Sequence, residues 1–233
     1  LSGIEKYEYA IGTTSGGTDV VDWTDNSTDT TVTRTDLTLT NGTTYYISVR
    51  STDNVGNVSS VASSDGVTID VTDPAISSVV EGSATGDVDY QNVVDELIIS
   101  WSGTDTASGI TSYEYALGTT SGGTDAIDWT SAGTSTSVTL TSLNLTEETT
   151  YYLSARATDV AGNVSDIVTG DGITIDLTAP AGTIVNDGTG EDISYTGSDT
   201  TLSANWPAFT EDVSGVSHYE IGVDDGDGDY ISW

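Results

Sequence analysis

The sequence predicts a tandem array of all-β domains, each a seven-stranded antiparallel Greek-key sandwich of about 106 residues. The first observation is a repeat: Ser2–Thr24 returns at Ser108–Thr130 with 18 identical positions, and one further step of the same length reaches Ser214. The second is an alternation of large and small side chains in segments rich in Val, Ile, Thr and Tyr, which is typical of half-buried strands. A repeat of this length is too long for a solenoid unit and fits one sandwich domain.

One full repeat contains seven strand-like segments separated by Gly, Asp, Asn and Thr turns. Because successive residues of a strand point to opposite faces, alternating large side chains are expected to form the inward faces. In chain order the expected strands are Ile76–Glu81, Glu96–Ser102, one through Tyr113 and Leu117, one leading to Trp129, one through Val138 and Leu140, one beginning at Thr149, and Gly172–Asp176. The residues expected inward are Leu97, Ile99, Trp101, Tyr113, Tyr115, Leu117, Tyr151, Leu153, Ala155 and Ala157, and the next copy repeats part of this pattern as Leu202, Ala204 and Trp206.

The turn before the sixth strand carries a family resemblance. Leu39–Val49 reads LTNGTTYYISV and Leu145–Tyr151 reads LTEETTY. Together with a Trp in the second strand and Tyr in the third, they resemble fibronectin type III domains, in which a Leu-x-Pro-Gly-Thr-x-Tyr corner ties the Tyr hydroxyl to the chain upstream. Asn41 stands where that family has proline.

Two further motifs resemble the Ig-like and fibronectin-like repeats of large bacterial surface proteins and adhesins. These are the Gly-Asn-Val-Ser endings near Asn57 and Asn163, and Asp-x-Thr-x-Pro at Asp70–Pro74 and Asp176–Pro180. The resemblance implies a fold and says little about activity.

The repeat period divides the chain into three parts. Residues 1–74 are expected to be the third to seventh strands of one domain, residues 75–180 a complete domain, and residues 181–233 the first three strands and part of the next. Partial copies would expose half a core if the chain ended there. The sequence is therefore expected to be a piece of a longer protein.

The chain is strongly acidic, with four Lys and Arg residues against 37 Asp and Glu residues and a formal charge of −33. Nucleic acid is excluded as a partner because phosphate binding requires Lys and Arg, and anionic lipid surfaces are disfavoured for the same reason. Self-repulsion of this kind weakens the compact state unless salt or bound divalent cations offset it. The sequence has no cysteine and no run of 18 apolar residues, so neither disulfides nor a membrane-spanning segment is predicted.

Oxygen-bearing side chains are expected to meet at the junction of the first two domains. In fibronectin-type topology the loops after the second and sixth strands lie at one pole, and the linker from the preceding domain arrives there. Calcium takes six to eight oxygen ligands, which such a cluster offers, whereas Asp and Asn also make simple turns by bonding their own backbone. The candidate calcium ligands at this junction are Asp70, Asp73, Asp105, Asp159 and Asn163.

Two further acidic groups are candidate calcium sites. Asp176 with Glu211 and Asp212 offers a similar set at the second junction. Towards the end of the chain, the spacing of three aspartates reproduces the first three ligand positions of an EF-hand loop, although Tyr230 replaces its glycine, and a solvated acidic turn is the alternative. These aspartates are Asp225, Asp227 and Asp229.

Two charged pairs recur at the repeat spacing. Glu8 with Arg50 and Glu114 with Arg156 lie on outward faces of strands that are neighbours in this fold, so cross-strand ion pairs are expected. An exposed pair of this kind stabilises by less than about 1 kcal/mol. Their predicted role is structural.

The sequence predicts no catalysis. His218 is the single histidine, and a Ser-His-Asp triad would need neighbours that the repeat does not supply. Trp23, Trp129 and Trp233 follow the Gly-rich loop of each copy. Exposed, they would stack on sugar rings; covering the edge of the sandwich core is the more common role of such a Trp.

The main functional hypothesis is a stalk or spacer in a secreted bacterial surface adhesin or filament, stiffened by calcium at the domain junctions. The expected location is extracellular, at the bacterial cell surface. The expected partners are neighbouring repeats of the same chain, with like chains in a filament and glycans as further possibilities. The alternatives are carbohydrate-binding accessory repeats of an extracellular polysaccharide-degrading protein, and a self-assembling filament or surface-layer subunit.

Overall fold

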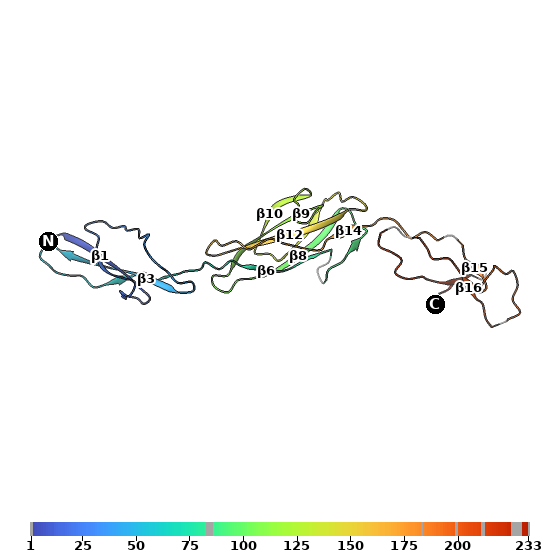
Figure 1. Ribbon diagram of the computed structural model, residues 1–233, viewed down its shortest axis with the longest axis horizontal. Helices are drawn as coiled ribbons and strands as arrows, with labels where there is room; N and C mark the ends of the chain where they lie inside the picture. Colours follow the sequence, from blue (N-terminus) through green and yellow to red (C-terminus); the bar gives the residue numbers. More distant parts are fainter. Residues whose placement is uncertain are drawn as a thin grey trace.

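The protein, seen here in a computed structural model, is a row of three β-rich segments that follow one another along the chain (Figure 1). The structure describes residues 2–82, 86–182, 184–198, 200–210, 213–224 and 230–232. All regular secondary structure in these ranges is β-strand, which confirms the predicted all-β class. Over the same ranges, no helix is long and apolar enough to cross a membrane.

The middle segment is a sandwich of two sheets. The first sheet has the order β11-β8-β6, formed by Ser137–Thr141, Glu96–Thr104 and Ala75–Glu81. The second has the order β10-β9-β12-β14-β7, formed by Ile127–Gly133, Ile110–Gly118, Thr150–Asp159, Ile173–Ile175 and Tyr90–Gln91, while β13 (Val168–Thr169) also pairs with β12. All pairs are antiparallel except β14 with β7. The seven predicted strands are therefore present, and β7 and β13 are two short additions.

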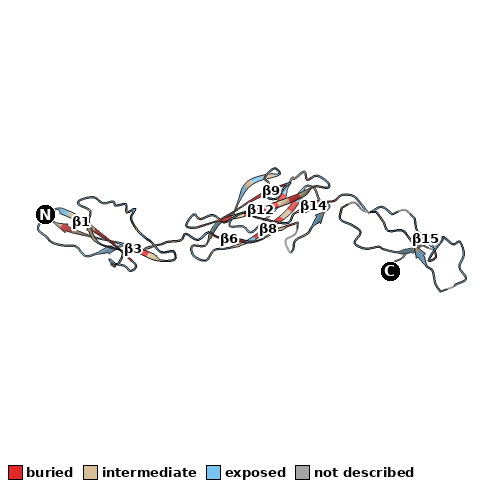
Figure 2. Ribbon diagram, in the orientation of Figure 1, coloured by how far each residue is buried: buried red, intermediate tan, exposed pale blue. Residues whose placement is uncertain are grey.

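Side chains from both sheets form the core of the middle segment, and Figure 2 colours the buried residues of this segment red. Each residue predicted to face inward from β8, β9 and β12 is at most 7% exposed. Trp101 lies at the centre of an aromatic group, with its ring centroid 5.7 Å from that of Tyr115 and 6.1 Å from that of Tyr113. The period-two pattern of the sequence was therefore sufficient to identify the inward faces.

The tyrosine corner of the fibronectin type III pattern is present in two copies. The hydroxyl of Tyr151 accepts a hydrogen bond of 3.1 Å from the backbone amide of Thr146, and Tyr45 accepts one of 2.9 Å from Thr40. Both rings are about as buried as core residues, at 6% exposure. The hydroxyl bond survives the replacement of proline by Asn41, because it depends on the position of the tyrosine and not on the turn residue.

The first segment has one main sheet. Its order is β2-β1-β3-β4, formed by Val21–Asp25, Ile4–Gly12, Thr44–Asp53 and Ala62–Ser63, with β5 (Val67–Thr68) also paired with β3. These strands correspond in repeat position to β10, β9, β12, β13 and β14. Tyr9, Ile11 and Tyr45 form a small buried cluster on this sheet.

The last segment departs from the sequence pattern. Its strands are β15 (Asn186–Asp187), β16 (Ala204–Asn205), β17 (Gly222–Asp224) and β18 (Tyr230–Ser232). Leu202 was predicted to face inward and is instead 72% exposed, and β16 has two residues instead of a full strand. The prediction was wrong here because alternation yields a buried face only where an opposing sheet covers it, and the described part of this segment supplies only short two-stranded pairs.

Candidate metal centre at the first domain junction

The linker between the first two segments is held in place by the first segment. The backbone amide of Val71 donates to Asn41 Oδ1 at 3.1 Å, and Asn41 Nδ2 donates to Thr72 Oγ1 at 2.6 Å. The amide of Thr72 donates to Asp70 Oδ1 at 3.0 Å, which closes the local turn that Asp residues favour. The carboxylate of Asp70 is thereby directed away from the first segment.

Asp70 contacts the middle segment through its second oxygen. Oδ2 accepts a hydrogen bond of 3.0 Å from the backbone amide of Ser108, in the loop between β8 and β9. The side-chain amide of Asn163 donates to the carbonyl oxygen of Asp70 at 3.2 Å. The linker is therefore bound by both loops that the sequence places at this pole.

Asp159 ends β12 and organises the loop that follows. Its Oδ1 accepts from the amides of Gly162 and Asn163 at 2.7 and 2.8 Å, and its Oδ2 accepts from Asn163 Nδ2 at 2.8 Å. The side chain is 1% exposed. Burial raises the pKa of Asp159, but the hydrogen bonds from Asn163 and Gly162 outweigh it, and the net pKa is lowered. The carboxylate is thus held in its charged form in a buried position.

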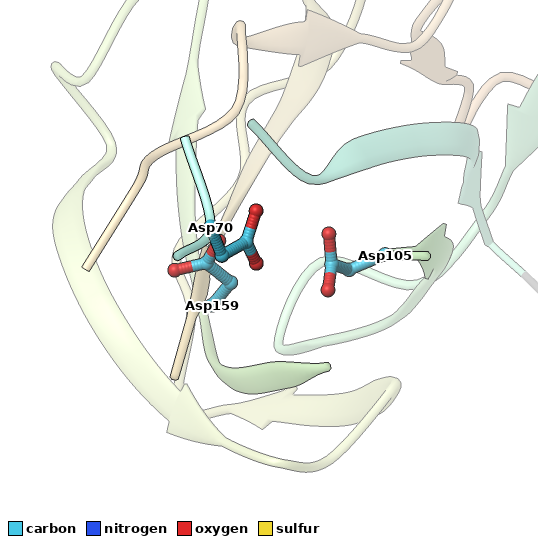
Figure 3. Close-up of side chains that lie close together, drawn as sticks. All are labelled: Asp70, Asp105 and Asp159. Atoms are coloured by element: carbon cyan, nitrogen blue, oxygen red, sulfur yellow. The ribbon is translucent and has the colours of Figure 1, made fainter. Parts of the chain in front are cut away.

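Asp105 faces this group from the opposite loop (Figure 3). Its Oδ2 accepts from the backbone amides of Ala107 and Gly109. Its Oδ1 is buried and has no hydrogen-bond partner among the described residues. A buried carboxylate oxygen without a partner is costly, and such a group calls for a ligand or a water.

The three carboxylates of Asp70, Asp105 and Asp159 each offer an oxygen within 4.8 Å of the other two. The ion pairs of the described residues all involve other acidic groups, so no Lys or Arg compensates the three charges. Three carboxylates that converge without a basic partner are a suitable ligand set for a hard cation such as Ca²⁺.

The remaining candidates of this junction occupy other positions. Asp73 is exposed and is not part of the three-carboxylate group. Asn163 lies beside the three carboxylates. Its side-chain amide nitrogen donates to Asp159 and to the linker carbonyls of Asp70 and Thr72, so this residue stabilises the loop.

The second junction repeats one contact of the first. Asp176 accepts from the amide of Thr178 through Oδ1 at 3.0 Å and from the amide of Ser214 through Oδ2 at 3.2 Å. Thr178 Oγ1 donates to Glu147, which occupies the position of Asn41 in the repeat. The other sequence candidates lie outside the described residues: Glu211, Asp212, Asp225, Asp227 and Asp229.

A serine that follows Asp105 by three positions also takes part in the junction, although its residue type does not single it out. At the first junction the backbone amide of Ser108 donates to the linker carboxylate of Asp70. At the second, the amide of Ser214 donates to that of Asp176. A signal was present, because Ser-Gly opens each copy of the repeat at the same position. Any residue other than proline has a backbone amide, so residue type does not identify these two donors. Only their recurrence at the repeat spacing could have done so.

Two of the three recurring Trp residues are covered by arginines, and Trp233 lies outside the described residues. Arg50 lies 4.2 Å from the ring centroid of Trp23, and Arg156 lies 4.5 Å from that of Trp129. The same arginines form the predicted cross-strand ion pairs, at 3.0 Å to Glu8 and 2.8 Å to Glu114. One face of each ring is therefore occupied by a guanidinium group in a cation–π contact.

The two-sheet topology, the tyrosine corner and the tandem order define an array of fibronectin type III-like or Ig-like sandwiches. No known family model matches the chain. The chain is 32% identical over 209 residues to Exoglucanase B of Cellulomonas fimi; the match covers 83% of this chain, and the chain spans 17% of the length of that protein.

Two solved structures resemble parts of the chain. The FN1–FN3 domains of chicken CNTN1 match with a TM-score of 0.39 and 15% identity, covering 72% of this chain and 56% of theirs. A group of neighbouring domains from titin matches with a TM-score of 0.44 and 18% identity, covering 74% of this chain and 55% of theirs. The fold assignment stands on the strand pairing described above.

Proposed function

We propose that this chain is an accessory array of sandwich domains in an extracellular polysaccharide-degrading protein, where it acts as a spacer. The observation that supports this role best is the similarity to Exoglucanase B, of which the chain matches a minor part. A segment of that size within a named exoglucanase is suited to an accessory role, and the two-sheet sandwich is a common module for it. The acidic, cysteine-free composition is compatible with an extracellular location.

The spacer is stiffened, in this proposal, by calcium bound to Asp70, Asp105 and Asp159. Asp70 belongs to the linker, whereas Asp105 lies in the loop after β8 and Asp159 is the last residue of β12 in the middle segment. An ion bound to all three would add a link between consecutive domains and would neutralise charges that otherwise repel one another. The hydrogen bond from Ser108 to Asp70 already supports the same geometry without the ion.

Thermal unfolding of the full chain in millimolar calcium and in EGTA tests the junction site. Preferential binding to the native state raises the Tm by mass action, so calcium should raise it by several degrees. Asp105→Asn should remove the part of this rise that comes from the junction site. Asp166→Asn is the matched control because it removes the same charge from an exposed position of the same segment. Equal calcium responses in both variants would refute the junction site.

Small-angle X-ray scattering tests the spacer role. Calcium should narrow the distribution of interdomain distances in the native chain and leave the Asp105→Asn chain unchanged. A native chain whose scattering profile is the same in calcium and in EGTA would refute stiffening by calcium, while leaving the accessory assignment to be judged separately.

Carbohydrate binding by the array has less support than the spacer role. Arg50 and Arg156 occupy one face of Trp23 and of Trp129, and a sugar ring would have to displace them to stack there. Co-sedimentation of the full chain with insoluble cellulose measures this directly. Retention that Trp129→Ala abolishes would replace the spacer role with a binding role. The adhesin and surface-layer roles stay predictions.

A further inference from the structure

A second group of carboxylates lies at the far end of β6 from the junction. Glu81 is the last residue of this strand, and six residues at about 3.3 Å each separate it from Ala75, so the two ends lie roughly 20 Å apart. After Glu81 the chain leaves the first sheet and enters the second, where β7 pairs with β14. Glu81 therefore marks the place where the chain crosses between the sheets.

Glu81 is a buried acid with an incomplete set of partners. Its side chain is 0% exposed. Oε1 accepts a hydrogen bond of 3.0 Å from the backbone amide of Leu153 in β12, whereas Oε2 has no hydrogen-bond partner among the described residues. Gly170 makes room for this carboxylate, because a Cβ at that position would lie 2.2 Å from Oε2. The chain thus provides a buried space shaped around this carboxylate, to which the described residues add one weaker contact, from the backbone amide of Gly172.

Two exposed aspartates complete the group. Asp87 follows β6, and Asp171 lies in the connection between β13 and β14. Each of the three residues offers a carboxylate oxygen within 4.8 Å of the other two. Asp87 is fixed by the backbone amide of Glu81, which donates to its Oδ1 at 3.0 Å. The group is therefore buried on the Glu81 side and open to solvent on the aspartate side.

No basic residue balances these charges. The ion pairs of the described residues involve Lys6, Arg34, Arg50, Arg156 and His218, and none reaches this group. Burial raises the pKa of Glu81 to about 7, with Asp87 and Asp171 adding to the effect. Burial and the neighbouring Asp171 also raise the pKa of Asp87. The arrangement is electrostatically unfavourable without a cation.

The local geometry recurs in the last segment. Asp187 occupies the repeat position of Glu81, and its amide donates to Asp192 Oδ1 at 3.0 Å, as the amide of Glu81 does to Asp87, although Asp192 follows five residues later and Asp87 six. The glycine after each acid has positive φ, at 88° for Gly82 and 96° for Gly188. A turn in which an acid's amide binds a following aspartate is thus present in both segments.

We propose that Glu81, Asp87 and Asp171 bind a calcium ion that fastens the sheet crossover after β6 to the connection between β13 and β14. Three carboxylates supply up to six oxygens, and the open side admits the waters that complete a coordination number of six to eight. The ion would give the buried Oε2 of Glu81 a close partner, which the hydrogen bonds among the described residues do not give it. This site is independent of the proposed function and of the junction site.

The test uses the full chain with Asp105→Asn as the parent, so that the junction site is absent. Titration with calcium chloride by isothermal calorimetry gives the number of bound ions, and thermal unfolding in calcium and in EGTA gives the stability change. Glu81→Gln and Asp171→Asn are added singly to this parent. Asp166→Asn is the matched control, since it removes an equal charge from an exposed position of the same segment.

The Glu81→Gln and Asp171→Asn chains should each bind one calcium ion fewer than the parent and the control. At calcium concentrations 100-fold above Kd, the parent should gain on the order of 10 °C in Tm that these two variants lose. In EGTA, Glu81→Gln should be at least as stable as the parent, because a neutral amide is easier to bury than an unpaired carboxylate.

Equal calcium stoichiometry and equal Tm shifts in the parent and in both variants would overturn the proposal. A parent that binds no calcium would overturn it as well, whatever the native chain does at the junction. Should Glu81→Gln fail to fold, Asp171→Asn still decides, because Asp171 is exposed and contributes no buried contact that folding requires.

Discussion

Asp53 in the first segment and Asp159 in the middle segment hold the same position in the repeat, yet their surroundings differ. Both accept hydrogen bonds from the backbone and side chain of an asparagine four residues later, Asn57 or Asn163. Asp53 completes its set with the hydroxyl of Ser2, at 2.8 Å. Asp159 has a similar contact with Ser108, the repeat equivalent of Ser2, but it also shares its site with two further carboxylates. The loop is therefore self-sufficient, and the docked linker of a preceding domain converts it into a charged cluster.

A second difference concerns one backbone amide of the sixth strand of each repeat. In the first segment the amide of Ile47 donates to Ser64 Oγ at 3.1 Å. In the middle segment the equivalent amide of Leu153 donates to Glu81, and Gly170 takes the place of the serine. A local hydroxyl and a distant carboxylate thus perform the same hydrogen-bonding task. Gly170 has no side chain and therefore leaves the space that the Glu81 carboxylate occupies.

The largest expected effect is a difference in calcium-dependent stability between variants of Asp159 and of Asp53. Asp159→Asn should abolish a calcium-dependent stabilisation of about 2.7 kcal/mol at calcium 100-fold above Kd, because it removes one of the proposed ligands. Asp53→Asn should leave the calcium response intact, since Asp53 belongs to no group of three or more carboxylates in the described structure. Urea denaturation with and without EGTA measures both. An equal loss of calcium-dependent stabilisation in both variants would contradict the expected difference between Asp159 and Asp53.

Exchanging the small residues tests the second difference. Gly170→Ser should destabilise the middle segment by about 1–3 kcal/mol, because its Cβ overlaps the Glu81 carboxylate and forces the surroundings to shift. Ser64→Gly in the first segment should cost about 1 kcal/mol through the lost hydrogen bond to Ile47. Chemical denaturation followed by fluorescence compares the two. A harmless Gly170→Ser would mean that Glu81 is not confined as described.

The tyrosine corners should respond alike in both regions. Tyr151→Phe and Tyr45→Phe each remove one hydroxyl that satisfies a backbone amide, so each should destabilise its segment by about 1–2 kcal/mol. Hydrogen exchange of the Thr146 and Thr40 amides provides a local measurement, and both amides should exchange faster in the respective variant. Protection that is unchanged in one segment would show that its corner is satisfied by another group.

The smallest expected effect concerns the ion pairs on the sheet surface. Glu114→Gln should reduce stability by less than about 1 kcal/mol, because the pair with Arg156 is partly exposed and salt screens it. Glu8→Gln should cost a similar amount in the first segment. Unfolding in low and high salt measures the difference. A cost that is large and independent of salt would indicate that the pair orients Trp129 and Trp23 through the arginines.

The sequence was sufficient for the fold of the middle segment because strand alternation and an internal repeat are both local signals. Leu97 and Leu153 were assigned to the core on spacing alone, and they are buried. Asp70, Asp105 and Asp159 were grouped by combining the repeat with the topology of the resembling family, and the structure brings their carboxylates together.

The parts that the sequence did not predict depend on long-range packing. A glutamate at a strand end has no feature that marks it as buried, and Glu81 is buried because Gly170, far along the chain, leaves space for it. Leu202 was assigned to a core on the same alternation that succeeded for Leu97, and it is exposed because the short pairs around it do not form an opposing sheet.

The contact from Asp70 to Ser108 recurs from Asp176 to Ser214, one repeat further along. When the same contact joins successive copies of one unit without closing on itself, the units follow a screw axis. Each added repeat then advances the array by the same translation and favours the same rotation. The direction in which the last domain faces is consequently set by the number of repeats before it. Inserting or deleting one repeat would change both the orientation of whatever the array carries and its distance from the start of the array.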